Sequence, residues 1–146
     1  MKAILPLLFL FFYFNSSFAQ SIRNGSSCGD KFLYAKDNLI RSEGTNGDKL
    51  YYLDGKIVRK GCSRCDKLFY MDGNTIRKGH SRGEKVYYID GKTIRKGCSN
   101  CEKLYYIDGS TIRKGHSRGE KVLNIDGKVG LWVIIAAIYH LDYGKK

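Results

Sequence analysis

Two Cys-x-x-Cys pairs are the residues of this chain best suited to chemistry. Cys62 and Cys65 form one pair, and Cys98 and Cys101 form the other, 36 residues further on. Paired thiolates at this spacing can bind zinc, and two such turns brought together would supply four ligands. The same cysteines can instead form two local disulfides in an oxidising compartment, or remain free thiols. All three states are compatible with the spacing alone.

Two histidines take the place of the first cysteine in related segments. His80 and His116 each lie in a Gly-His-Ser-Arg-Gly stretch, at the position that Cys62 and Cys98 occupy in theirs. They extend the alternative zinc-ligand set to Cys62, Cys65, Cys98, Cys101, His80 and His116. The simpler interpretation is a single exposed turn position that differs between duplicated units. We therefore expect no metal site and no cofactor.

A second pattern combines basic and aromatic side chains. It consists of four Arg-Lys pairs, each with a tyrosine seven residues before its arginine: Arg59, Lys60, Arg77, Lys78, Arg95, Lys96, Arg113 and Lys114, with Tyr52, Tyr70, Tyr88 and Tyr106. Cations interleaved with aromatic rings suit an anionic surface glycan. The alternative is a solvated strand face whose long basic side chains cover apolar surface and discourage edge pairing.

The acidic residues do not suggest catalysis. No nucleophile, base and acid stand together in the sequence. Five aspartates directly precede glycine and are explained by turn chemistry: Asp54, Asp72, Asp90, Asp108 and Asp126. We therefore predict a protein that is not an enzyme.

An 18-residue repeat positions all of these residues. Four regular copies span 48–65, 66–83, 84–101 and 102–119, with a degenerate copy near 30–47 and a last one that fades after residue 127. In the copy 84–101, an aromatic and β-branched run ends at Asp90-Gly91, the dipeptide of a type I′ hairpin turn, and a second short strand follows. Each copy therefore predicts one β-hairpin.

Such a turn predicts which side chains share a face. Tyr87 would lie opposite Ile94, so that Tyr87, Ile89 and Ile94 face the core. The equivalent core residues are Tyr51, Leu53, Val58, Phe69, Met71, Ile76, Tyr105, Ile107 and Ile112. One hairpin is marginally stable in water, so the units must pack on one another.

The hairpins are expected to close into a ring. Counted from a second strand to the next first strand, there are five return units: 39–53, 56–71, 74–89, 92–107 and 110–125. A linear array would leave exposed strand edges, whereas a closed ring has none. We predict an all-β ring of tandem hairpins with approximate five-fold symmetry. Symmetry would hold equivalent turns apart, which favours the local disulfides Cys62–Cys65 and Cys98–Cys101.

The two ends of the chain differ from the repeat. Residues 1–19 resemble a cleaved secretory signal, with Lys2 followed by an apolar run and small residues before Gln20. We expect residues 20–30 to be a flexible N-terminal segment and residues 31–146 to form one domain. The formal net charge of +12 becomes +11 once Lys2 is removed. Nucleic acid is not expected as a partner of an exported protein.

The C-terminal stretch 131–141 is the most apolar part of the mature chain. It is shorter than the roughly 20 residues that span a bilayer. We therefore expect no membrane span in the mature chain, and a buried closing segment, either a strand or a short helix. Trp132 would then be a core residue.

The repeated Ile-Asp-Gly-x-x-Ile-Arg-Lys-Gly motif, the signal with Gln20 after the cut and the Ala-containing apolar tail resemble one known family. It is the family of small exported bacterial proteins described as five-fold β-flower proteins. The resemblance implies a ring of short hairpins in an exported protein of the Bacteroidetes type, with no assigned activity or catalytic residues.

Three functions remain open from the sequence. The first is an exported structural or interaction module, in the periplasm, at the cell surface or secreted. The second is a binder of anionic surface glycan through the Arg-Lys and Tyr residues, and the third is a zinc-binding protein. The partner is left open by the sequence, and the two candidates are an anionic surface polysaccharide and another envelope protein.

Overall fold

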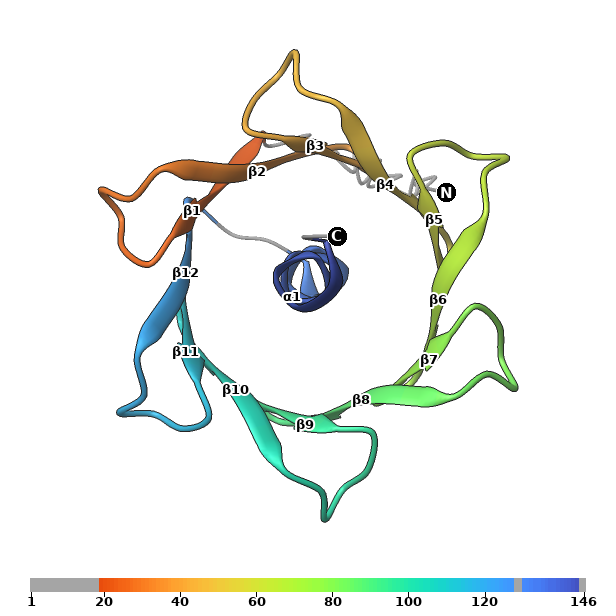
Figure 1. Cartoon of the computed structure of the whole chain (residues 1–146), viewed down its shortest axis with the longest axis vertical. Coiled ribbons are helices and arrows are strands. Elements are labelled where there is room, and N and C mark those ends of the chain that lie inside the picture. The colour runs from red at the N-terminus through yellow and green to blue at the C-terminus, as the bar shows by residue number, and fades with distance from the viewer. Residues whose placement is uncertain (1–18, 128–129, 145–146) are drawn as a thin grey trace, which may run out of the picture.

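A closed ring of antiparallel strands surrounds one helix in the computed structural model, which describes residues 19–127 and 130–144 (Figure 1). Consecutive strands pair along the chain, and the first strand closes the ring by pairing with both the second and the last. The elements are β1 (Gln20–Asn24), β2 (Lys31–Lys36), β3 (Leu39–Ser42), β4 (Lys49–Asp54), β5 (Ile57–Lys60), β6 (Lys67–Asp72), β7 (Thr75–Lys78), β8 (Lys85–Asp90), β9 (Thr93–Lys96), β10 (Lys103–Asp108), β11 (Thr111–Lys114), β12 (Lys121–Ile125) and α1 (Leu131–Tyr143).

The ring of hairpins is confirmed, but its symmetry is six-fold and the predicted five-fold symmetry is wrong. β12 and β1 form a sixth hairpin that has no connecting turn, with Ile22 opposite Ile125. The segment 20–30, which we predicted to be flexible, is therefore β1 and the turn that follows it. Its Ile22-Arg23-Asn24-Gly25 matches the Ile-Arg-Lys-Gly of the other units. The pairing partner lies at the opposite end of the sequence, so the local pattern showed only half a hairpin.

The hairpin turn lies one residue later than predicted. Asp90 pairs with Thr93, so the two loop residues are Gly91 and Lys92. Only Gly91 has positive φ, at 57°, which is typical of a type II′ turn rather than type I′. Tyr87 consequently lies opposite Lys96, two residues from the predicted partner. A shift of two residues leaves each side chain on its predicted face, because the side-chain period of a strand is two.

A β-bulge follows every hairpin and helps to close the ring. Between β7 and β8, Ile76 pairs with Tyr87 and Arg77 with Lys85, which leaves Val86 as the extra residue. The Val86 carbonyl accepts a hydrogen bond from the Gly97 backbone N–H at 3.1 Å. Bulges bend and twist a strand, as closure into a barrel requires. The equivalent half-buried apolar residues are Phe32, Leu50, Leu68, Leu104 and Val122.

The interior of the ring is filled. Tyr87, Ile89 and Ile94 are buried, as predicted for the inward face. Around the ring, one layer consists of Ile22, Ile40, Val58, Ile76, Ile94 and Ile112, each at most 1% exposed. A barrel of about eight strands is just filled by its own side chains, and one of about eleven strands holds a central helix. Twelve strands therefore leave room for α1, which lies within the ring (Figure 1).

The apolar C-terminal segment was predicted to be either a strand or a short helix, and the structure shows the helix. Residues 133–138 are all buried, as expected for a helix that is apolar on every side. Trp132 is half-buried and packs against the core. In the described part of the chain, no helix has both the length and the hydrophobicity that crossing a membrane would require.

Candidate functional site

The turns that return from one hairpin to the next project outward like petals (Figure 1). Cys62 and Cys65 lie in the petal between β5 and β6, and Cys98 and Cys101 in the petal between β9 and β10. Each pair lies at disulfide-bonding distance, with Cα atoms 5.1 Å apart. The petal between β7 and β8 separates them, so the ring does not bring the four cysteines together.

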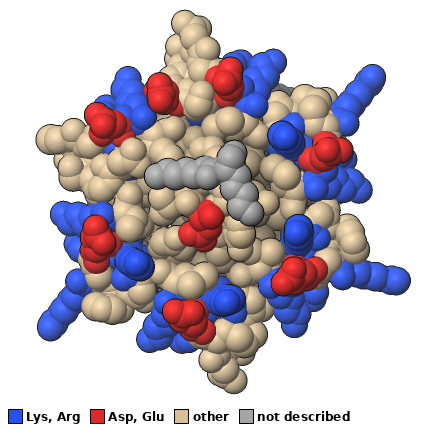
Figure 2. Space-filling view, viewed as in Figure 1, with Lys and Arg blue, Asp and Glu red and all other residues tan. Residues whose placement is uncertain are grey.

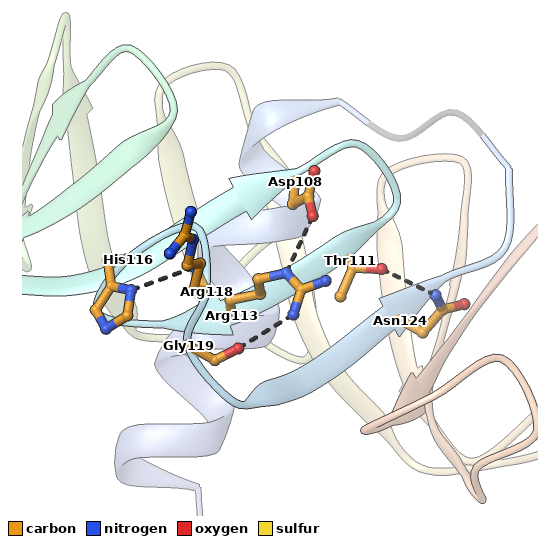
Figure 3. Close-up of polar contacts among 7 residues, drawn as sticks. All are labelled: Asp108, Thr111, Arg113, His116, Arg118, Gly119 and Asn124. Carbon is orange, nitrogen blue, oxygen red and sulfur yellow. Dashed lines mark hydrogen bonds and ion pairs between the residues drawn. The ribbon is translucent and has the colours of Figure 1, made fainter.

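Histidine stabilises two of the four petals that lack a Cys pair. The Nδ1 atom of His80 accepts a hydrogen bond from the backbone N–H of Arg82 at 3.2 Å. His116 and Arg118 make the same contact at 3.2 Å in the petal between β11 and β12 (Figure 3). The imidazole therefore closes its own turn, as the disulfide does in the neighbouring petal.

The alternative zinc site is not assembled. Its six candidate ligands lie in four different petals: Cys62, Cys65, His80, Cys98, Cys101 and His116. Across residues 19–127 and 130–144, no group of three or more His, Cys, Asp or Glu side chains is placed to hold a metal ion.

One arginine in each unit connects the petal to its hairpin through hydrogen bonds. Arg113 donates from Nη1 to the Gly119 carbonyl at 3.1 Å and from Nε to the Asp108 carboxylate at 3.0 Å (Figure 3). All six units contain the first contact, at 2.9 to 3.2 Å, from Arg23, Arg41, Arg59, Arg77, Arg95 and Arg113. Five contain an Arg–Asp ion pair, at 3.0 to 3.5 Å, with Asp126, Asp54, Asp72, Asp90 and Asp108. These arginines are committed to the fold.

The Arg23–Asp126 pair has a special position because it joins the two ends of the ring. Arg23 lies on β1, and Asp126 directly follows β12. It repeats across the chain termini the contact that the other units make within one hairpin. Sequence reasoning explained these aspartates by turn chemistry alone and missed their ion pairs.

Among the Arg-Lys pairs and their associated tyrosines, the lysines and the tyrosines are the residues that solvent can reach. Lys60, Lys78, Lys96 and Lys114 are exposed, whereas Tyr52, Tyr70, Tyr88 and Tyr106 are half-buried on the outer face. Each of these tyrosines lies opposite the arginine of its own hairpin. Basic and acidic side chains lie side by side around the rim (Figure 2). The rim therefore presents local pairs of opposite charge in addition to its net positive charge.

One unit departs from this arrangement. In the hairpin of β2 and β3, Lys36 stands where the other units have aspartate. Arg41 still donates to the Gly47 carbonyl at 3.1 Å, but no described carboxylate forms an ion pair with it. A groove of about 440 Å³ lies here, lined by Tyr34, Lys36, Asp37, Asn38, Leu39, Arg41, Thr45 and Tyr52.

A hydrogen-bonded network anchors the end of α1 inside the ring. The Tyr87 hydroxyl donates to Asp142 Oδ2 at 2.5 Å, and the Tyr105 hydroxyl donates to Oδ1 of the same carboxylate. The Tyr51 hydroxyl lies 2.7 Å from His140 Nδ1. A carboxylate near a helix C-terminus is unfavourable, and the two phenol donors offset this cost. A cleft of about 460 Å³ opens beside these residues, with Tyr139 and Tyr143 in its wall.

Burial controls the ionisation of the anchoring tyrosines. The pKa of Tyr87 is raised above its ordinary value by burial, then by its hydrogen bond to Asp142 and by the charge of that carboxylate. The same causes raise the pKa of Tyr105. Burial and the neighbouring Tyr139 raise the pKa of Tyr51. The neutral phenols are therefore the form that the folded ring stabilises.

Sequence reasoning placed these three tyrosines in the core but missed their polar contacts. A buried phenol needs a hydrogen-bond partner, and His140 and Asp142 are polar residues at the end of the apolar stretch. That combination was the available signal.

Comparison with known proteins identifies a family. The sequence profile of a family described as "6-fold beta flower protein" matches residues 21–138. No curated protein and no solved structure matches the chain.

We expect the ring to lose stability in alkali because the pKa values of Tyr51, Tyr87 and Tyr105 are raised in the folded state. A folded-state pKa above the ordinary value of about 10 means that the stabilisation is complete below pH 10. It is lost as the pH rises towards the folded-state pKa, at about 1.4 kcal/mol per pH unit for each tyrosine. Tyr87→Phe should therefore make the decline above pH 10 shallower by about that amount. Urea unfolding at a series of pH values measures it, and identical slopes for the two proteins would contradict the account.

Proposed function

The chain belongs to the family of 6-fold beta flower proteins, and from this premise we propose that it is an exported structural or interaction module that acts without catalysis. The single observation that carries the proposal is the filled interior. α1 occupies the space inside the ring, with residues 133–138 buried. The described surface available to a partner is therefore the outside of the ring, its rim and its petals.

Two features support export. Residues 1–19 have the pattern of a cleaved signal, and β1 begins at Gln20, directly after the expected cut. Cleavage there would leave every strand of the ring intact. The two Cys pairs at disulfide-bonding distance suit an oxidising compartment.

Expression of the full chain in a Gram-negative host tests this proposal. We expect periplasmic protein whose mass begins at Gln20, and unreduced peptide maps that join Cys62 to Cys65 and Cys98 to Cys101. Leu8→Arg, which interrupts the apolar run of the leader, is the control and should keep the uncleaved chain in the cytoplasm. Uncleaved or cytoplasmic protein from the unaltered chain, or four alkylated cysteines, would refute export as proposed here.

A second function, glycan binding, is favoured by four exposed lysines, each opposite an inward-facing aromatic residue at the end of its hairpin. Because the arginines are committed to petals and aspartates, the cations available to an anionic polysaccharide are Lys60, Lys78, Lys96 and Lys114. Charge attraction of this kind weakens as salt screens it.

Retention on an immobilised anionic polysaccharide measures this second function. We expect retention of the unaltered ring at low salt and elution as salt rises. Replacing the four lysines by glutamine should abolish retention, whereas replacing the four equivalent tyrosines by phenylalanine tests the hydroxyls alone at unchanged charge. Retention that neither salt nor the lysine changes affect would count against the proposal.

A further inference from the structure

The hairpin of β2 and β3 differs from the other units at the position whose aspartate forms an ion pair with arginine. In the other five units, Arg Nε faces an aspartate carboxylate at 3.0 to 3.5 Å. In the hairpin of β2 and β3 that position is Lys36. Arg41 keeps its contact with the petal carbonyl of Gly47, so its backbone-binding role is unchanged. The substitution alters only the outer side of the guanidinium.

Because Lys36 replaces this aspartate, the outer N–H groups of Arg41 have no carboxylate acceptor within the described chain. Arg41 lines the groove, and its Nε is not among the buried unpaired atoms of the described residues. Asp37 also lines the groove and has an interaction of its own. Net charge is therefore not the distinguishing feature of this groove. What distinguishes it is an arginine fork that no carboxylate of the described chain occupies.

Aromatic side chains flank the same fork on neighbouring strands. Tyr34 on β2 lies directly opposite Arg41 on β3. Tyr52 on β4 lies opposite Leu39, also on β3. All four residues line the groove of about 440 Å³, a volume within the range of small-molecule sites, roughly 300 to 1,000 Å³.

These groups match one class of ligand. A guanidinium fork binds carboxylates in a bidentate manner, and a lysine beside it adds a second cation. Tyrosine combines an apolar ring face with a polar hydroxyl, which suits a sugar ring with C–H groups on a face and hydroxyls at its edge. We propose that the groove across β2, β3 and β4 binds a carboxylated saccharide, with Arg41 and Lys36 on the carboxylate and Tyr34 and Tyr52 on the sugar.

This inference rests on the proposal that the ring binds anionic glycan, and it assigns a carboxylated saccharide to one groove that is separate from the four rim lysines. The repeat itself supplies the decisive variant. Lys36→Asp installs the residue of the other units, so Arg41 would gain the carboxylate partner that its equivalents already have. Folding should be unchanged, because five units of the same ring contain this pair.

Calorimetric titration with tetragalacturonate at low salt tests the proposal. We expect one binding site on the unaltered ring and about ten- to a hundredfold weaker binding by Lys36→Asp, since a hydrogen-bonded ion pair is lost. Arg41→Gln should weaken binding to a similar extent. Lys56→Asp is the matched control, because it changes the net charge equally at an exposed hairpin turn two strands away, and it should bind like the unaltered ring. Maltotetraose, which has no carboxylate, should not bind.

Several outcomes would contradict the proposal that this groove binds a carboxylated saccharide. They are no binding of tetragalacturonate, equal effects of Lys36→Asp and Lys56→Asp, or inorganic phosphate competing as well as the saccharide, which would indicate an adventitious ion only. If the lysine replacements at the rim abolish polysaccharide retention while Lys36→Asp binds normally, the rim function stands and the groove is refuted. If the rim replacements have no effect while Lys36→Asp loses binding, the groove is supported and the rim function fails.

Discussion

The burial of α1 is the interaction on which the rest of the ring depends. Burying Val133, Ile134, Ile135 and Ile138 contributes roughly 6–12 kcal/mol, at about 1.5–3 kcal/mol for each side chain. The net stability of a domain is about 5–15 kcal/mol. Without the helix, the inward layers of all twelve strands would face an empty or wet lumen. The ring and its central helix are therefore one cooperative unit.

The contacts that repeat in all six units and the residues that differ between units have different roles in this molecule. The contacts that repeat in every unit, such as the bond from each arginine to its petal carbonyl, hold the ring together. The exceptions appear where the ring meets something that is not six-fold. Tyr51, Tyr87 and Tyr105 occur where α1 ends, and Lys36 replaces aspartate where a groove faces solvent.

Much of the fold could be predicted because it follows from short-range patterns. The inward faces, the hairpins and the separation of the two Cys pairs all follow from the 18-residue period. The turn position was not predicted, because the aspartate of the Asp-Gly dipeptide belongs to the last ladder pair, Asp90 with Thr93, rather than to the turn. The bulges, such as the one at Val86, are also not revealed by a period of two. The sixth unit was missed because Ile22 pairs with Ile125 across the whole chain. The groove at Arg41 becomes visible only once the Arg–Asp pairs of the other units are known.

Hydrogen exchange of the folded chain tests most directly whether α1 and the ring are one unit. An isolated helix of this length is marginal in water, so strong protection of its amides requires the surrounding strands. We predict that amides of residues 135–138 exchange within about tenfold of the slowest amides of β4 and β8, by global unfolding. Exchange of the α1 amides about a thousandfold faster, with the strands still protected, would contradict the account because the ring would then be stable without its helix.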